Sequence, residues 1–442
     1  MRIRASDVAA ATGGRLTGPD VDLDGASFDS RTVQQGQLFV ALVAERDGHD
    51  FAAAALAAGA GAALVSRPLE APETTTTIEV ADTAVALLDL ATWARRRLPA
   101  TVVGVTGSVG KTSTKDLLAV AIGADRRVAV NARSFNNEQG LPVTVLGAPD
   151  DTEILVVEMG MRGFGEITRL CAVAHPDIGV VTRVAPSHTE RVGGIDGVAM
   201  AKAELVMALP PTGTAVLNAD DERVAAMASA TEAAVVTFGE AAGATVRVER
   251  LTLDAMARPT FTARTPWGDV DVRLAVSGAH MATNAAAALA VSGIVGVDIA
   301  AAASALQTAT LSAGRMQVIH VAAGGVVVDD AYNANPASMR AALDALSCVD
   351  ANRRIAVLGV MAELDDPVSA HAEIAAHAAG LGIELVPVGT DRYGRPPVDR
   401  HGAVDAVGTI EAGVAVLVKA SLVGGLQRVA ADLVAAAGGA AD

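Results

Sequence analysis

The segment from residue 101 to residue 112 constrains the fold more than any other part of the chain. An apolar run over residues 101–106 leads into Gly107-Ser108-Val109-Gly110-Lys111-Thr112, and a helical pattern follows. Glycines let the backbone approach an anion, successive N–H groups form an anion nest, and the helix adds its positive end. The pattern predicts a phosphate-binding strand–loop–helix unit, with Lys111 on the β- and γ-phosphates of a nucleotide and the Thr112 hydroxyl on Mg²⁺.

The match to the standard phosphate-loop motif is incomplete, because Val105 stands where that motif has its first glycine. A structural turn is the alternative, but a strand before the loop and a helix after it favour nucleotide binding. We therefore predict that the whole loop contributes to the nucleotide site: Thr106, Gly107, Ser108, Val109, Gly110, Lys111 and Thr112.

Apolar strand-like runs alternate with helical patterns along most of the chain. Such alternation predicts an α/β fold with parallel sheets covered on both faces. In the middle of the chain the runs are residues 101–106, 154–158, 178–182 and 215–218. Further runs at residues 326–330, 354–359, 384–388 and 414–418 predict a second, smaller sheet of the doubly wound, Rossmann-like kind.

A length of 442 residues suggests roughly three domains. We predict an N-terminal domain over residues 1–80, a central domain with the phosphate loop over 81–312, and a C-terminal domain over 313–442. A cleft is expected between the last two domains, with a hinge near residues 312–315.

The composition excludes several classes of protein. A formal net charge of −16 and 2% aromatic residues argue against a nucleic-acid partner. Two cysteines provide no disulfide framework, and no bulky apolar run reaches the roughly 20 residues that span a bilayer. Residues 1–11 lack the apolar core of a signal peptide. These features predict a cytoplasmic protein without membrane insertion.

Three further residues are candidates for the metal and the chemistry. Glu158 ends an apolar strand, where open α/β sheets place ligands, and His188 follows the next one. Lys202 lies in a helical, mostly apolar stretch. Taken singly, each has an ordinary explanation: a solvated strand-end carboxylate, a surface histidine, and a lysine that extends to solvent from an amphipathic helix. Asn136 and Asn137 could cap a helix or hold a phosphate, and the residues alone leave this open.

Together these motifs resemble the Mur ligases over nearly the whole chain, most closely the members that add D-alanyl-D-alanine to UDP-N-acetylmuramoyl-tripeptide. Besides the phosphate loop, the matching motifs are Asp29-Ser30-Arg31-Thr32-Val33, Asp47-Gly48-His49-Asp50-Phe51, Phe135-Asn136-Asn137-Glu138, Glu158-Met159-Gly160, Ala201-Lys202-Ala203-Glu204, Gly278-Ala279-His280, Gly314-Arg315 and Asp329-Asp330-Ala331-Tyr332-Asn333-Ala334-Asn335-Pro336.

The resemblance implies roles for individual residues. Lys111 would hold the ATP phosphates, while Thr112, Glu158 and His188 would organise Mg²⁺. Lys202 matches a lysine that the family carbamylates into a metal ligand. The remaining matches are Asn137, Asn284, Arg315, Asp330 and Asn333 around the nucleotide, Ser30 and Arg31 at the uridine diphosphate, and Lys419 at the substrate.

The resemblance further implies an ATP-dependent ligase that acts through an acyl-phosphate on small-molecule substrates, and we expect a monomer. The chain departs from the family pattern at Val360 (usually Asp), Leu422 (usually Arg) and Met281 (usually Asn). Two alternatives remain: another amide ligase of this superfamily, such as a folate polyglutamylating enzyme, and a paralogue that binds nucleotide without catalysis.

Overall fold

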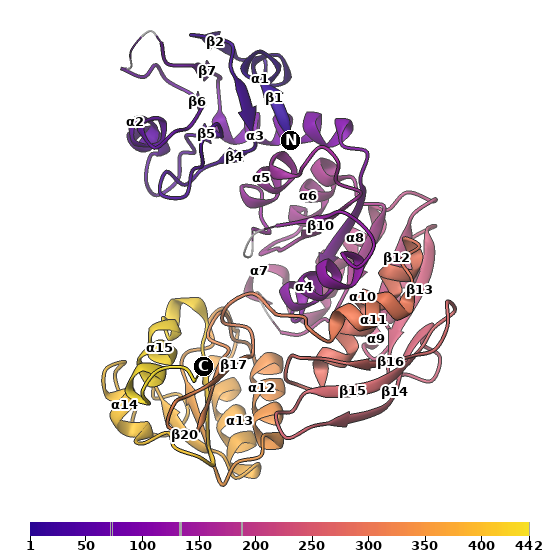
Figure 1. Ribbon diagram of the computed structural model, residues 1–442, viewed down its shortest axis with the longest axis vertical. Helices are drawn as coiled ribbons and strands as arrows, with labels where there is room; N and C mark the ends of the chain where they lie inside the picture. Colours follow the sequence, from indigo (N-terminus) through magenta and orange to yellow (C-terminus); the bar gives the residue numbers. More distant parts are fainter. Residues whose placement is uncertain (71, 73, 132–134, 187–188, 442) are drawn as a thin grey trace.

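The computed structural model describes residues 1–70, 72, 74–131, 135–186 and 189–441. Three larger sheets follow one another along the chain, each with its own helices. Figure 1 shows three successive parts, the N-terminal one at the top and the C-terminal one, in orange and yellow, at the lower left. The strands of the three sheets lie within residues 15–79, 101–273 and 317–419.

The N-terminal part combines a small sheet with three short helices. Its five strands run, in spatial order, β2 (Arg15–Thr17), β7 (Thr77–Glu79), β6 (Ala62–Val65), β5 (Leu38–Val40) and β4 (Ala26–Ser27). A separate pair joins β1 (Arg2–Arg4) to β3 (Asp22–Asp24), and the helices are α1 (Ala5–Thr12), η1 (Gly48–Phe51) and α2 (Ala52–Ala57). β5 and β6 are buried along their whole length, as expected for strands covered on both faces.

The central part is built on a nine-stranded sheet. Its spatial order is β16-β15-β14-β13-β12-β11-β8-β10-β9. The strands are β8 (Thr101–Thr106), β9 (Val128–Val130), β10 (Ile154–Glu158), β11 (Ile178–Val181), β12 (Thr214–Asn218), β13 (Ala234–Gly239), β14 (Val246–Leu253), β15 (Pro259–Arg264) and β16 (Val270–Arg273). The parallel strands β8 and β10–β12 are nearly continuous runs of buried apolar residues.

The predicted all-parallel sheet is only part of what forms. β14 pairs antiparallel with β15, and β15 pairs antiparallel with β16. In β14 and β16, more buried and less buried residues alternate along the strand, as expected where one face of a sheet is open to solvent. The extension therefore lacks the continuous apolar runs by which the parallel strands were recognised.

Helices cover both faces of the central sheet. α4 (Lys111–Ile122), α10 (His280–Ile294) and α11 (Ile299–Leu306) pack on one face together with Val103 and Val105. On the other face lie α3 (Thr83–Arg97), α5 (Gly140–Gly147), α6 (Glu166–Ala174) and α8 (Ile195–Met207), with α7 (Thr189–Val192), α9 (Glu222–Ala226) and η2 (Met227–Ala230) nearby.

The C-terminal part is a smaller sheet of the doubly wound kind. Its spatial order is β17 (Gln317–His320), β18 (Val326–Asp329), β21 (Val414–Lys419), β19 (Arg353–Leu358) and β20 (Glu384–Pro387), and only β17 is antiparallel to its neighbour. The helices are α12 (Pro336–Cys348), α13 (Pro367–Gly380), α14 (Gly402–Val407), η3 (Leu422–Gly424) and α15 (Gln427–Ala436). α12 begins where Asn335 accepts a hydrogen bond from the Ser338 N–H and Pro336 occupies the first helical turn.

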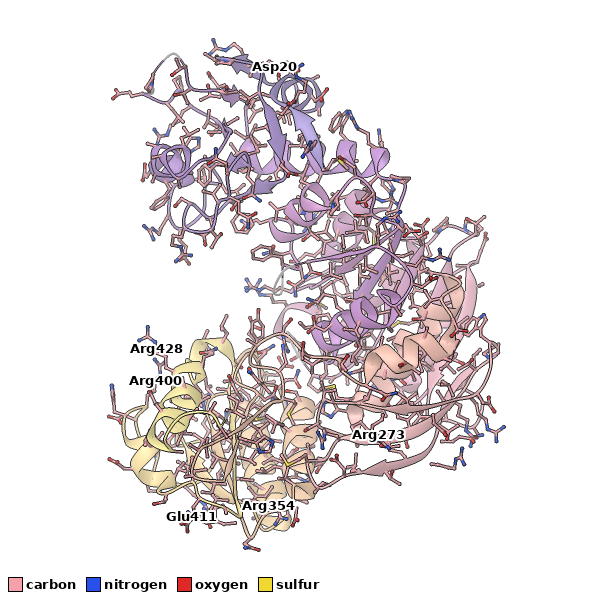
Figure 2. All side chains as sticks on the ribbon, in the orientation of Figure 1. Asp20, Arg273, Arg354, Arg400, Glu411 and Arg428 are labelled. Carbon is pink, nitrogen blue, oxygen red and sulfur yellow. The ribbon has the colours of Figure 1, made fainter. Side chains whose placement is uncertain are left out.

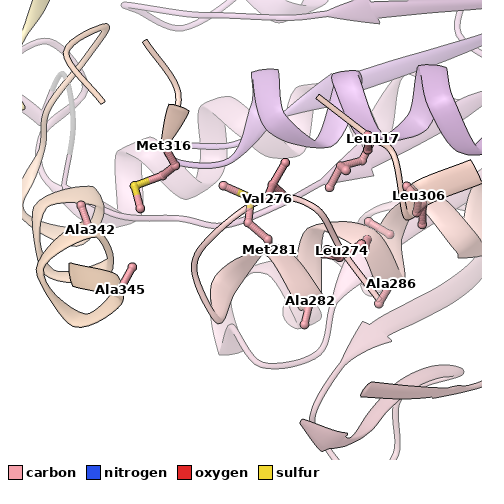
Figure 3. Packing of buried hydrophobic residues seen from close by; sticks show 14 of the residues in the cluster. Leu117, Leu274, Val276, Met281, Ala282, Ala286, Leu306, Met316, Ala342 and Ala345 are labelled. Atoms are coloured by element: carbon pink, nitrogen blue, oxygen red, sulfur yellow. The ribbon is translucent and has the colours of Figure 1, made fainter. Parts of the chain in front are cut away.

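Two features join the central and C-terminal parts besides the connecting chain. One apolar cluster includes Met281 and Leu117 of the central part and Ala342 of α12 (Figure 3). In addition, the Asp350 N–H donates to the Ala255 carbonyl over 2.7 Å, beside an isolated bridge between Met256 and Val349. The C-terminal part is therefore held at two separate places.

Charged side chains such as Asp20, Arg273 and Glu411 lie on the outside of the molecule (Figure 2). Among the helices of the described part of the chain, none has the length and apolar character needed to cross a membrane.

Candidate active site

The loop between β8 and α4 has the backbone shape of a phosphate-binding loop. Gly107 and Gly110 have φ angles of 150° and 88°, in the left-handed region that favours glycine. A Cβ atom on Gly107 would lie 1.9 Å from the Thr182 hydroxyl oxygen. That hydroxyl donates to the Val109 carbonyl over 2.6 Å and fixes the loop against the end of β11. The loop and the N-terminus of α4 consequently face one cavity.

Lys111 lies at the start of α4 and folds back over this loop. Its Nζ donates to the Gly107 carbonyl over 2.7 Å. Burial lowers the pKa of Lys111, while the nearby Glu158 raises it and Arg315 lowers it further. A phosphate in the cavity would favour the charged ammonium, because an adjacent negative charge stabilises it.

Thr112 and Glu158 form a buried polar pair beside Lys111. The Thr112 hydroxyl donates to Glu158 Oε2 over 2.8 Å. The other carboxylate oxygen, Oε1, accepts from the Asn136 amide over 2.7 Å, and the Glu158 N–H donates to Asn131 Oδ1 over 3.1 Å. These bonds fix the carboxylate at the carboxyl end of β10, where a metal or phosphate can be bound.

Arg315 reaches this pair from the segment that connects the central and C-terminal parts. Its Nη2 donates to the Thr112 hydroxyl oxygen over 3.0 Å. The guanidinium carbon also lies 4.2 Å from the ring centroid of Tyr332, a cation–π arrangement. The contact places a cation of the C-terminal side directly on the loop.

Lys419 and Asp330 form the wall of the cavity on the C-terminal side. They lie at the ends of the neighbouring parallel strands β21 and β18. Lys419 Nζ donates to Asp330 Oδ2 over 2.5 Å and to the Asn333 carbonyl over 2.9 Å. Asp330 Oδ1 accepts from the Met316 N–H over 3.1 Å. Burial lowers the pKa of Lys419, and Asp330 opposes that shift.

These groups line a single cavity of about 180 Å³ between the two parts. Burial lowers the pKa of His280, at its edge, to about 4, so this imidazole is neutral at pH 7. The other lining residues are Ser108, Val109, Gly110, Ser113, Asn136, Met281, Asn284, Met316, Tyr332, Asn333, Asn335, Ser338 and Ala341.

Lys202 lies close behind the cavity, in α8, with a relative exposure of 3%. Burial lowers its pKa well below the ordinary value, and the positive charge of Lys111 lowers it further. Among the described residues, Lys202 makes no hydrogen bond and no ion pair. These surroundings favour the neutral amine, which is the nucleophilic form.

Several predicted residues lie elsewhere. Thr106 is buried and donates to the Met159 carbonyl, away from the cavity. Asn137 is exposed, and its Oδ1 accepts from the Gly140 N–H at the start of α5. Of the two uses considered for the asparagine pair, the structure thus gives helix capping to Asn137, while Asn136 enters the cavity.

The predicted uridine-diphosphate residues lie in the N-terminal part. Arg31 is exposed and paired with Asp29 through two bonds of 2.8 and 2.7 Å, and Ser30 precedes it in the turn between β4 and β5. Neither residue lines the cavity. His188 lies outside the described residues.

The donors present fit Mg²⁺. Among the described residues, no three His, Cys, Asp or Glu side chains gather as a metal cluster. Mg²⁺ is usually bound by one or two carboxylate or hydroxyl oxygens together with water and phosphate oxygens. Thr112 and Glu158, whose oxygens are 2.8 Å apart, are such a pair of oxygen donors.

Residues 105–292 match the Mur ligase middle domain, and residues 314–422 match the Mur ligase glutamate ligase domain. The UDP-N-acetylmuramoyl-tripeptide–D-alanyl-D-alanine ligase of Mycobacterium tuberculosis is 42% identical over 406 residues, which cover 85% of this chain and 79% of that protein. The chain belongs to the Mur ligase family. The resemblance inferred from its motifs is therefore confirmed.

Solved Mur ligases share the fold over almost the full length. MurF from Acinetobacter baumannii superposes with a TM-score of 0.87 at 28% identity, covering 98% of this chain and 99% of that chain. The MurF ligase of Thermotoga maritima in complex with ADP has a TM-score of 0.79 at 26% identity, over 93% of this chain and 96% of that one. The predicted α/β Mur ligase architecture is confirmed.

Sequence reasoning missed two residues of this Mur ligase site: Thr182 fixes the loop, and Tyr332 stacks on Arg315. Asn136 was considered as a cap or a phosphate ligand, and in the structure it orients Glu158 instead. Thr182 ends a predicted strand, and Tyr332 lies in a matching run. The available signal was position at the carboxyl end of a strand.

Proposed function

We propose that this protein is an ATP-dependent amide ligase that joins D-alanyl-D-alanine to UDP-N-acetylmuramoyl-tripeptide in peptidoglycan precursor synthesis. The observation that carries the proposal is the cavity in which Lys111, Thr112 and Glu158 meet Arg315 and Lys419. The curated relative from Mycobacterium tuberculosis, at 42% identity, bears the name of that ligase.

The phosphate loop would bind ATP. Backbone N–H groups of the loop and of the N-terminus of α4 would receive the phosphates, except that of Ser108, which already donates to the Arg183 carbonyl. Lys111 would exchange its bond to the Gly107 carbonyl for a phosphate oxygen. Arg315 would add a second cation once it leaves Thr112. Positive groups that are already oriented stabilise the charge that spreads over the transferring phosphoryl group.

Mg²⁺ would be held by Thr112 and Glu158, and we extend the set to His188 and to Lys202 as its carbamate. The metal supplies charge neutralisation at the phosphoryl oxygens. Asn136 keeps the Glu158 carboxylate in position. The neutral Lys202 amine can add CO₂ by forming an N–C bond and releasing one proton, and the resulting carbamate would offer oxygen donors.

The chemistry has two steps. A carboxylate oxygen of the tripeptide attacks the γ-phosphorus of ATP, the bond to the β-phosphate oxygen breaks, and ADP and an acyl-phosphate form. The dipeptide amine then attacks the acyl carbon, loses a proton, and phosphate leaves as the amide forms. Because water would hydrolyse the acyl-phosphate, closure of the cleft around a hinge at residues 312–315 protects it.

We assign the outer sites by domain. Residues 1–80 would bind the uridine diphosphate through Ser30 and Arg31, residues 81–312 the ATP, and residues 313–442 the amine. Lys419 stays a substrate-site proposal through its place on the cavity wall. The roles of Asn137 and Thr106 as nucleotide contacts remain predictions from the sequence. We further propose a cytoplasmic monomer.

The departures from the family pattern bear on the amine site. Leu422 is 58% exposed in η3, and the Val360 carbonyl accepts from the Ser421 N–H. Neither side chain can donate a hydrogen bond to an amine substrate or its carboxylate. Backbone groups and neighbouring residues would therefore provide that recognition.

The deciding experiment measures phosphate release from Mg-ATP with UDP-N-acetylmuramoyl-tripeptide, with and without D-alanyl-D-alanine. Release that requires both substrates, with a pentapeptide product by mass spectrometry, supports the proposal. Release with the tripeptide and a different amine would move the specificity to another amide ligase. ATP binding without release for any pair of substrates would favour a non-catalytic paralogue.

A further inference from the structure

Lys115 is a buried cation for which the chemistry above has no use. It lies on α4, one helical turn after Lys111, and its relative exposure is 2%. An ammonium without compensating partners is costly to bury. The chain has only four lysines, Lys111, Lys115, Lys202 and Lys419. The other three lie at or just behind the cavity, so Lys115 belongs to a small group concentrated around the site.

The partners of Lys115 connect it to Glu158. Its Nζ donates to the Asn131 carbonyl over 3.0 Å and lies 3.0 Å from Asp116 Oδ1. Asn131 directly follows β9, and its side-chain oxygen accepts from the Glu158 N–H. The ammonium thus holds the residue that fixes the backbone of Glu158.

Asp116 connects the same pair to the chain that leads into the C-terminal part. Asp116 Oδ2 accepts from the Ser312 N–H over 2.8 Å, and Oδ1 accepts from the Ser312 hydroxyl over 3.1 Å. The two residues are 196 positions apart in sequence, and the side chain of Asp116 is 11% exposed. Three residues later, Arg315 donates to Thr112.

These contacts form a closed circuit. It runs from Ser312 through Asp116, Lys115 and Asn131 to Glu158, then through Thr112 and Arg315 back to the same connecting segment. Hydrogen bonds to charged partners are stronger than neutral ones, and desolvation strengthens them further. Two members of the circuit, Lys115 and Asp116, do not line the cavity.

We propose that Lys115 and Asp116 are positioning residues that hold the connecting segment, residues 309–316, in fixed relation to Glu158. The pair sets where the chain enters the C-terminal part, and so where Arg315 meets Thr112. The inference rests on the proposed function for the roles of Glu158 and Arg315 in ATP turnover. The physical tether itself does not depend on that function.

The test compares wild-type protein with Lys115→Met and Asp116→Asn. Methionine retains the length of the lysine without its charge, and asparagine retains the shape of the aspartate. Thr308→Ala is the matched control, because this exposed hydroxyl lies in the turn just before the segment and donates to the Ala305 carbonyl at the end of α11. Hydrogen–deuterium exchange of nucleotide-free protein is followed in the peptide that covers residues 309–316.

We expect exchange of this peptide to accelerate roughly tenfold in both variants and to stay unchanged in Thr308→Ala, since a charged hydrogen bond protects the Ser312 amide. In turnover assays, the Mg²⁺ concentration for half-maximal rate should rise in both variants, while KM for the UDP substrate stays constant. Unchanged exchange in folded Lys115→Met protein overturns the proposal.

Two controls keep the outcomes separate. Should Lys115→Met fail to fold, the isosteric Asp116→Asn decides by the same exchange criterion. Should wild-type protein show no ligase activity, the proposed function fails, yet the exchange measurement still accepts or rejects the tether.

Discussion

Thr112 and Glu158 share a 2.8 Å hydrogen bond although 46 positions separate them in the sequence. They meet because β8 and β10 are adjacent parallel strands, with Glu158 in register with Val105. The helix after β8 begins with Lys111, so Thr112 stands above the end of β10. Strand order thus brings a hydroxyl and a carboxylate, two ligand types that Mg²⁺ accepts, to one point.

Glu158→Gln should weaken metal use and leave the fold intact. The amide keeps the size of the side chain but removes the negative charge that the metal needs. We expect the Mg²⁺ concentration for half-maximal ATP turnover to rise at least about tenfold. Glu153→Gln is the control, because Glu153 precedes β10 at its opposite end and pairs with Arg126 and Arg127. If the two variants showed the same Mg²⁺ dependence, the assignment of Glu158 as a metal ligand would be wrong.

Lys111→Met should abolish most of the phosphoryl transfer. Removing an oriented cation from the transferring phosphate typically costs about 10²-fold or more in rate. Turnover is measured by phosphate release, and thermal unfolding checks the fold. Arg223→Met, at a surface ion pair with Asp196, should behave as wild type. Retention of full activity in Lys111→Met would refute the assignment of the phosphate loop.

Lys202 should carry a carbamate in bicarbonate buffer. Because burial and Lys111 lower its pKa, a larger fraction is the neutral amine that attacks CO₂. Native mass spectrometry should detect one added CO₂ in wild type and none in Lys202→Met, whose activity should fall at least about tenfold. With only four lysines in the chain, peptide mapping can locate the adduct. An adduct that persists in Lys202→Met would place it elsewhere.

His280 should make stability depend on pH. Burial lowers its pKa to about 4 from the ordinary 6.5, so the unfolded chain binds the proton more tightly than the folded one. The resulting loss of stability begins as pH falls below 6.5 and is complete below about 4, amounting to at most about 3 kcal/mol. Urea unfolding of His280→Gln should show a shallower slope across this window than wild type. The exposed His401→Gln should keep the wild-type slope.

The two cysteines should differ in reactivity. Burial raises the pKa of Cys171 to about 12, whereas Cys348 is exposed. A thiol reagent at pH 8 should therefore label one thiol in folded protein and two in denatured protein, because the thiolate is the reactive form. Cys348→Ser should leave the folded protein unlabelled. Fast labelling of that variant would show that α6 opens readily.

The parallel cores of the fold could be predicted from the sequence because their signal is local. The apolar runs at 101–106 and 154–158 and the helical pattern after the phosphate loop coincide with β8, β10 and α4. Burial on both faces forces continuous apolar residues, which are visible without a structure. β14 and β16 escaped prediction, because a strand with one solvent-exposed face gives a weaker, alternating pattern.

In the site, too, the parts that lie close together in the sequence could be predicted. Gly107, Gly110 and Lys111 belong to one short loop and the start of one helix, so the whole motif is visible in the sequence. The sequence did not show which of Asn136 and Asn137 enters the site. In the structure Asn136 bonds to Glu158 and Asn137 bonds to the start of α5, which depends on the path of the backbone before that helix. The contact of Arg315 with Thr112 depends on how two domains are placed.

The second contact between the central and C-terminal parts, from the Asp350 N–H to the Ala255 carbonyl, restricts how the cleft can close. The bonds of Ser312 to Asp116 hold the end of the central part, where the chain leaves for the C-terminal part, as a second fixed place. The apolar cluster that also joins the two parts is non-directional and can slide, so rotation about the line through these two places breaks neither set of hydrogen bonds. While both contacts last, closure is a swing like that of a door, and the amine would travel toward the acyl-phosphate along an arc.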